Sequence, residues 1–165
     1  MVTRKGILVT AVILATIGAA SFVVWVVPQN RGSSFVVSDY RSELESIKER
    51  HVLVTTEMAS DFKELLDKTR SPNDFIGKAQ ISSTQITSLI TDLIESNPPV
   101  EWRESYLNYD ESLEKYNEYL TETISLAKRI KGGMSPADLN DEISKIDSLK
   151  KESDSLVIKS NETHP

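Results

Sequence analysis

The chain lacks cysteine entirely and has only two histidines, His51 and His164, among its 165 residues. Without cysteine it can form neither a disulfide framework nor a thiolate nucleophile. A zinc site needs three or four convergent nitrogen or sulfur ligands, and a di-iron bundle needs Glu-x-x-His pairs; the sequence supplies neither. Glycine-rich phosphate loops, nucleophile elbows and Ser-His-Asp sets are also missing. We therefore predict a protein that is not an enzyme and that binds no metal or cofactor.

Positive charge is also in short supply. The chain has 19 Lys and Arg against 25 Asp and Glu, for a net charge of −6. An acidic surface of mixed charge argues against nucleic acid as a partner and against lying flat on anionic lipid. The densest acidic run falls between residues 101 and 122, at spacings of three, four and seven that a solvated helix face explains. Its members are Glu101, Glu104, Asp110, Glu111, Glu114, Glu118 and Glu122.

One long apolar run stands out against this polar background. Residues 7–27 contain no charged residue, follow Arg4 and Lys5, and end at Pro28. A helix needs about 20 apolar residues to cross the hydrocarbon core of a bilayer. A cleaved signal peptide is the alternative, with small residues before Ser21, but its apolar region is typically only about 7–15 residues long. We predict a retained single-pass transmembrane anchor that doubles as the export signal.

The flanks of this anchor predict its orientation. Arg4 and Lys5 precede it closely, which favours a cytoplasmic N-terminus over residues 1–6 and an extracytoplasmic C-terminal part. Within the run, Ala11, Ala15 and Ala19 recur every four residues. Such a stripe of small residues suits close helix pairing and makes a weak homodimer a further hypothesis.

The basic leader also carries a resemblance. Arg4, Lys5 and Gly6 stand directly before the apolar run, which resembles the leader of type IV pilin-like proteins, cut just after a glycine. Members of that family usually carry a Glu five residues into the mature chain, where this sequence has Ala11. A pilin-like surface subunit is therefore kept as an alternative function.

After a linker over 28–37, apolar residues recur at steps of three and four through four segments, which predicts helices. The expected ranges are 38–70, 72–96, 99–131 and 136–158, followed by a polar tail over 159–165. Ser38 is the expected N-cap of the first helix, and Ser71 and Ser135 each precede a proline at a helix start. The expected apolar face of the second helix includes Ile94.

Each predicted helix has one apolar stripe and short connections, so the stripes must meet between antiparallel neighbours. We predict an all-α fold: an up-down antiparallel four-helix bundle over residues 38–158, behind the N-terminal transmembrane helix. A three-helix core with a looser fourth helix is the runner-up, because Ser153 interrupts the fourth stripe. An elongated coiled-coil array is the third option.

Aromatic residues gather on the third predicted helix. Tyrosine hydroxyls need polar partners, so Trp102, Tyr106 and Tyr109 are the candidate contacts for a ligand or partner. His51 falls on the apolar stripe of the first helix, as a hydrogen-bonded core histidine would. Tyr119 stands one position off the stripe, so Tyr119→Ala is expected to cost far less stability than Leu113→Ala.

Three function classes follow from this pattern. We favour an interaction or scaffold module, displayed outside the cell membrane and binding another envelope protein. The alternative is an extracytoplasmic ligand-sensing bundle that signals through a partner, an analogy that rests on fold alone. An open aromatic pocket inside the bundle favours the sensor, whereas a filled core with a surface patch favours the scaffold.

Overall fold

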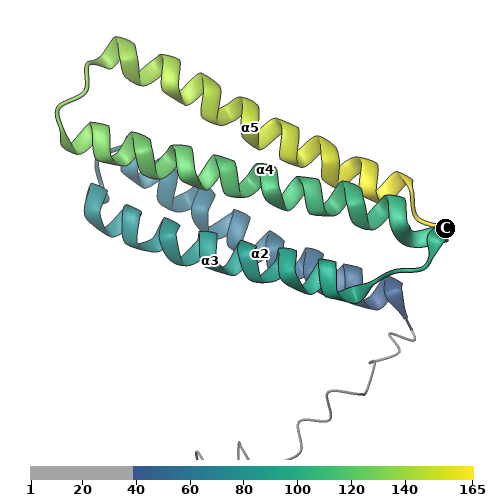
Figure 1. Ribbon diagram of the computed structural model, residues 1–165. Coiled ribbons are helices and arrows are strands. Elements are labelled where there is room, and N and C mark those ends of the chain that lie inside the picture. Colours follow the sequence, from purple (N-terminus) through teal and green to yellow (C-terminus); the bar gives the residue numbers. More distant parts are fainter. Residues whose placement is uncertain (1–38) are drawn as a thin grey trace, which may run out of the picture. The chain divides into compact units, whose positions relative to one another are not determined.

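The computed structural model describes residues 39–165, and these form four helices packed against each other. They are α2 (Tyr40–Leu66), α3 (Pro72–Ser96), α4 (Val100–Lys131) and α5 (Pro136–Glu162), and no strand occurs in this part of the chain. Consecutive helices run in opposite directions and are joined by turns of a few residues (Figure 1). The prediction of an all-helical body of four packed helices is confirmed.

The predicted anchor, linker, alanine stripe and pilin-like leader, all within residues 1–37, lie outside the described residues, as does Ser38. None of the four described helices is long and apolar enough to span a bilayer. The transmembrane segment over residues 7–27 therefore stays a prediction.

Local capping explains where three of the helices begin. The Ser71 hydroxyl accepts a hydrogen bond from the Asp74 backbone N–H and donates one to the Asp74 carboxylate over 2.7 Å. Ser135 and Asp138 repeat the arrangement at the start of α5. The bond from the aspartate N–H to the serine hydroxyl satisfies a donor that the first turn of each helix leaves unpaired, and the bond from the hydroxyl to the carboxylate holds the serine in place. At α2 the N-cap is Asp39, whose carboxylate accepts from the N–H of the residue three positions on.

Two helix ends differ from the sequence-based ranges. The first helix ends at Leu66 instead of residue 70, because Lys68 takes a left-handed conformation (φ 60°) and the next two N–H groups turn back to the Glu64 carbonyl. The last helix continues to Glu162 instead of ending at 158. Its final turn is held by Ser160, which is fully buried against α4. Residues 159–162 are therefore helical, and Ser160 among them is packed against α4, which corrects their assignment to the polar tail.

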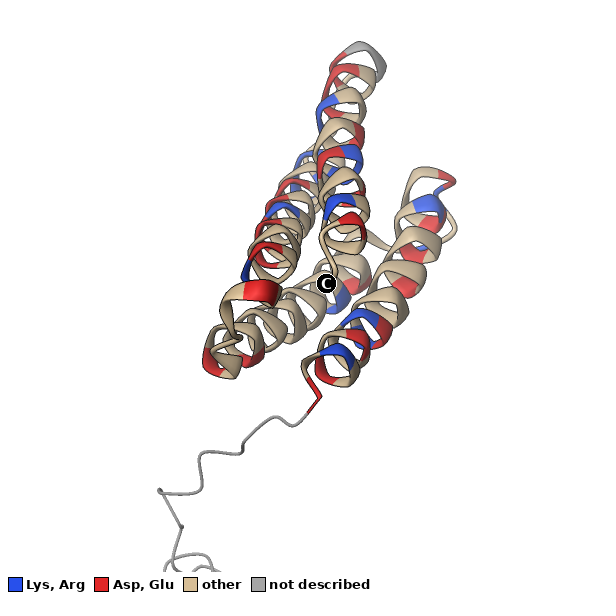
Figure 2. Cartoon of the chain, turned by 90° about the vertical axis from the view of Figure 1, so that its right-hand side faces the viewer, with Lys and Arg blue, Asp and Glu red and all other residues tan. Residues whose placement is uncertain are grey.

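A buried carboxylate with two cationic partners links α2 to the connection that follows it and to α3. The Asp61 carboxylate is buried and lies 2.7 Å from the Arg70 guanidinium and 3.1 Å from the Lys78 ammonium. Removing either cation would leave more of a buried negative charge uncompensated. Charged residues are frequent along α2, α4 and α5, whereas α3 has none between Lys78 and Asp92 (Figure 2).

The core lies between all four helices, and α4 contributes the largest share of it. Its residues Tyr109, Leu113, Tyr116, Leu120 and Leu126 are almost fully buried. α4 packs lengthwise against α3 on one side and α5 on the other, whereas α2 packs mainly against α3. The Cα atoms of α2 and α5 stay more than 8 Å apart. These two helices meet through side chains, such as Lys48 with Asn161.

A row of serines joins α4 to α5. The Ser105 hydroxyl donates to the Ser160 carbonyl over 2.8 Å, and the Ser153 hydroxyl donates to the Ser112 carbonyl over 2.9 Å. All four serines are buried, one heptad apart on each helix. Because the distance between packed helices depends on the side chains at the contact, serine lets these two backbones approach closely. Ser153 is thus a packing residue and not an interruption of the stripe.

The expected register of α4 was wrong at Tyr119. Its side chain is only 5 % exposed. The ring stacks on Tyr116, with centroids 5.1 Å apart, and meets the edge of Phe62 at 6.3 Å. Because α4 is covered by helices on two sides, its buried face is wider than the single stripe read from the sequence.

Candidate functional site

The candidate aromatic residues occupy three different environments. Tyr106 is buried, and its hydroxyl donates to the Tyr40 carbonyl over 2.9 Å and lies 3.2 Å from the Glu43 carboxylate. Burial and the Glu43 charge raise its pKa well above the usual value. Trp102 is half-buried and packs on the His164 ring, with centroids 5.3 Å apart. Tyr106 thus ties α4 to the start of α2, and Trp102 ties it to the C-terminal residues.

Tyr109 belongs to a polar cluster inside the core. Its hydroxyl lies 2.9 Å from Nδ1 of His51, and the His51 ring packs edge-on against both Tyr109 and Tyr116. Burial, assisted by the positive charge of Lys150, lowers the pKa of His51 to about 4. Within residues 39–165, neither Nε2 of His51 nor the Tyr116 hydroxyl has a hydrogen-bond partner. The cluster is consequently a neutral, desolvated part of the core.

Open space lies on the surface between α3 and α4. We call this space the α3–α4 groove; its volume is about 290 Å³. Two apolar residues that line it are exposed to solvent: Ile94 is 67 % exposed and Leu107 is 57 % exposed. The exposure of Ile94 corrects its assignment to the buried face. The lining residues are Leu93, Ile94, Asn97, Pro98, Arg103, Tyr106, Leu107 and Asp110.

Asp110 places a partly buried carboxyl group in this groove. Its Oδ1 atom is buried and has no hydrogen-bond partner among the described residues. Burial raises the pKa of Asp110, and the negative charges of Glu114 and Glu111 raise it further. A carboxylate in this situation gains stability from any cationic or N–H donor that reaches it.

A second, wider groove of about 850 Å³ crosses the outer face of α4 and reaches α5. Its floor includes Ile90 and Leu149, and the Ser83 hydroxyl ties α3 to α4 by donating to Asn117 over 2.6 Å. Four glutamates line it: Glu114, Glu118, Glu122 and Glu142.

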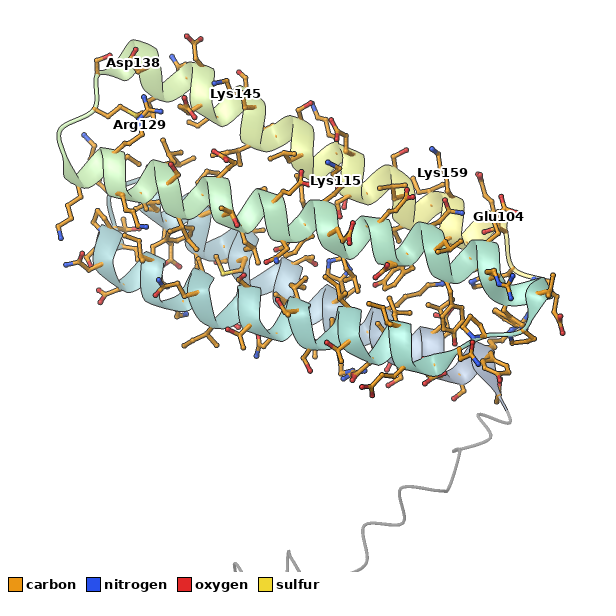
Figure 3. All side chains as sticks on the ribbon, in the orientation of Figure 1. Glu104, Lys115, Arg129, Asp138, Lys145 and Lys159 are labelled. Atoms are coloured by element: carbon orange, nitrogen blue, oxygen red, sulfur yellow. The ribbon has the colours of Figure 1, made fainter. Side chains whose placement is uncertain are left out.

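Two of these glutamates already have cationic partners. Lys115 lies 2.8 Å from Glu118, and Arg129 of α4 lies 2.7 Å from Glu142 of α5. Figure 3 labels the two cations, Lys115 and Arg129. Glu142 has a lowered pKa because of the Arg129 hydrogen bond. The wide groove therefore combines an apolar floor with a largely acidic rim.

Sequence reasoning did not find these grooves, although two signals were present. Leu107 is an apolar residue off the α4 stripe, and Asp110 was grouped with a solvated acidic face.

Among residues 39–165, no three His, Asp or Glu side chains gather closely enough to hold a metal ion. Comparisons with models of protein families, with curated proteins and with solved structures return no match.

Proposed function

We propose that the chain is a single-pass membrane protein whose helical bundle lies outside the membrane and acts as an interaction or scaffold module in the cell envelope. The tether is the uncharged run over residues 7–27, which is long enough to cross a bilayer. The partner is another envelope protein.

One observation carries the choice of an interaction module. Among residues 39–165 the tyrosines of α4 are buried by other side chains of the bundle, and the hydroxyls of Tyr106 and Tyr109 already have partners there. Apolar side chains nevertheless face solvent beside a surface groove at Ile94 and Leu107. A ligand sensor would instead need open space among the tyrosines. A filled core with an apolar surface groove supports docking of a macromolecule.

The tether and its orientation can be tested together in the full-length chain. We expect the protein to stay with membranes after alkaline carbonate washing. Ser155 is exposed on α5, so Ser155→Cys should react with a membrane-impermeant thiol reagent in intact cells. Ser160 is unsuitable for this because it is buried.

Thr3→Cys is the matched control and should react only after lysis. Release by carbonate, or a processed N-terminus near Ile7 or Ser21, would contradict the retained anchor. Labelling of Thr3→Cys but not Ser155→Cys in intact cells would contradict the orientation.

A further inference from the structure

We infer that the α3–α4 groove and the wide groove form one docking surface for a basic amphipathic helix of a partner protein. The inference rests on the proposed interaction function and names the class of partner that this face takes.

The two grooves are neighbours along the same pair of helices. Ile94 and Asp110 line the α3–α4 groove, and Ile90 and Glu114, one turn further along α3 and α4, line the wide groove. The combined face extends from Arg103 to beyond Asn117, which corresponds to more than 20 Å, or about four turns, of α4. That length matches a helix of ordinary size laid along the groove.

Apolar contact is available along this face. Single exposed apolar residues are normal on a protein surface. Here Ile94 and Leu107 flank one groove, with Leu93 and Pro98 beside them, and Ile90 and Leu149 continue the floor. An amphipathic helix inserts side chains spaced by three and four residues into a groove of this kind.

Charge selects a basic occupant. The buried Oδ1 atom of Asp110 lacks a donor among the described residues, and burial raises the pKa of that carboxyl. A Lys or Arg side chain of the partner that approaches the half-buried Asp110 carboxylate would meet it in a partly desolvated site, where charge-assisted hydrogen bonds are strong. Five carboxylates, including Glu114 and Glu122, line the combined face against two cations, Arg103 and Lys145, so its lining is acidic on balance. A second copy of this acidic chain has the wrong overall charge to fill it.

The test uses the full-length protein in non-ionic detergent micelles and a fluorescent helical peptide of leucine and lysine, with leucines at steps of three and four. A peptide with glutamate in place of every lysine is the matched control, and empty micelles set the baseline. We expect saturable binding of the lysine peptide only, weakening as salt is added.

Variants locate the binding surface. Asp110→Asn removes the charge and Leu107→Ala removes the apolar wall; each should weaken peptide binding about tenfold, equivalent to about 1.4 kcal/mol. Leu53→Ala, on an exposed position of α2 that lines neither groove, should bind like the parent. Unchanged circular dichroism melting of the variants separates lost binding from lost folding.

Equal binding of the two peptides, or parental affinity in both Asp110→Asn and Leu107→Ala, would overturn the inference. Dimerisation that Leu107→Ala abolishes, without peptide binding, would overturn it in favour of a second copy. Membrane anchoring and Ser155→Cys labelling are measured independently of peptide binding. A negative peptide-binding result would therefore not contradict the proposed membrane tether, and a negative anchoring result would not contradict the docking surface.

Discussion

The Nδ1 atom of His51 and the hydroxyl oxygen of Tyr109 lie 2.9 Å apart and link α2 to α4 inside the core. The charged groups around this pair include Lys48, whose ammonium lies over the Tyr109 ring, Glu45 of α2, and Lys150 and Asp154 from α5. Desolvation dominates, so His51 is neutral in the folded protein at neutral pH. Protonation would place a positive charge in a site that offers it little solvation.

The first prediction follows from this linkage. The folded state lowers the pKa of His51 from 6.5 to about 4, so the unfolded chain binds a proton more readily than the folded one. The contribution of His51 to stability is complete above pH 6.5 and is lost as the pH falls toward 4. Between pH 7.5 and pH 4.5 the loss should be about 2–3 kcal/mol. Urea unfolding at the two pH values measures it.

His51→Gln is the control for that prediction. It keeps a polar group near Tyr109 but has no proton to gain, so its stability should change less over the same pH range. His164, whose pKa is also lowered by burial, and Asp110, whose pKa is raised, titrate in both proteins and cancel in the difference. An identical pH dependence in parent and variant would show that His51 is not desolvated.

The second prediction concerns the serine row between α4 and α5. Ser112→Leu should force the two backbones apart, and overpacking of this kind costs about 1–3 kcal/mol. Ser112→Ala should cost less, because the Ser153 hydroxyl still donates to the backbone carbonyl at position 112. Thermal unfolding of the two variants compares them. Equal stability of Leu and Ala at this position would mean that α4 and α5 are not closely packed.

The third prediction replaces the sequence-based expectation for Tyr119. Its ring stacks on Tyr116 and touches Phe62, so Tyr119→Ala should cost about 2–5 kcal/mol, the same range as Leu113→Ala. Leu107→Ala, at an exposed position of the same helix, should change stability by about 0.5 kcal/mol or less. Urea denaturation ranks the three. A small effect of Tyr119→Ala would restore the original register of α4.

The fourth prediction is that residues 38–165 fold without the anchor. The core is built from side chains of the four described helices, so the fragment should be soluble, strongly helical and cooperative in melting. A fragment ending at residue 158 should melt at a lower temperature, because it loses Ser160 and the Lys48–Asn161 hydrogen bond. Aggregation of the longer fragment, or equal melting of the two, would argue against this packing.

The sequence predicted the features that depend on local chemistry. Serine followed by proline, with aspartate three positions after the serine, specifies the starts of α3 and α5, because the bonds that cap each helix lie within one turn. Apolar spacing likewise placed Leu113 and Leu120 in the core. These inferences needed no knowledge of which helix lies beside which.

The other features of the fold and the site depend on contacts between helices, which the apolar stripe of one helix does not reveal. Ser153 reads as a polar interruption until α4 presents Ser112 opposite to it. Tyr119 reads as exposed until α2 presents Phe62 beside it. The groove at Leu107 and Asp110 forms between residues of α3 and α4, and the unpaired Oδ1 atom of Asp110 follows from burial that spacing cannot predict.

The fifth prediction is the most direct test of an extracytoplasmic module that docks its partner on the α3–α4 face. A photo-cross-linking amino acid is placed at Leu107 or, as control, at Leu53 of the full-length chain in intact cells, and the cross-linked peptides are identified by mass spectrometry. We expect Leu107 to capture one envelope protein through a segment rich in Lys or Arg, and Leu53 to give background only. Cross-links confined to Leu53, or to acidic segments, would contradict the proposed docking surface.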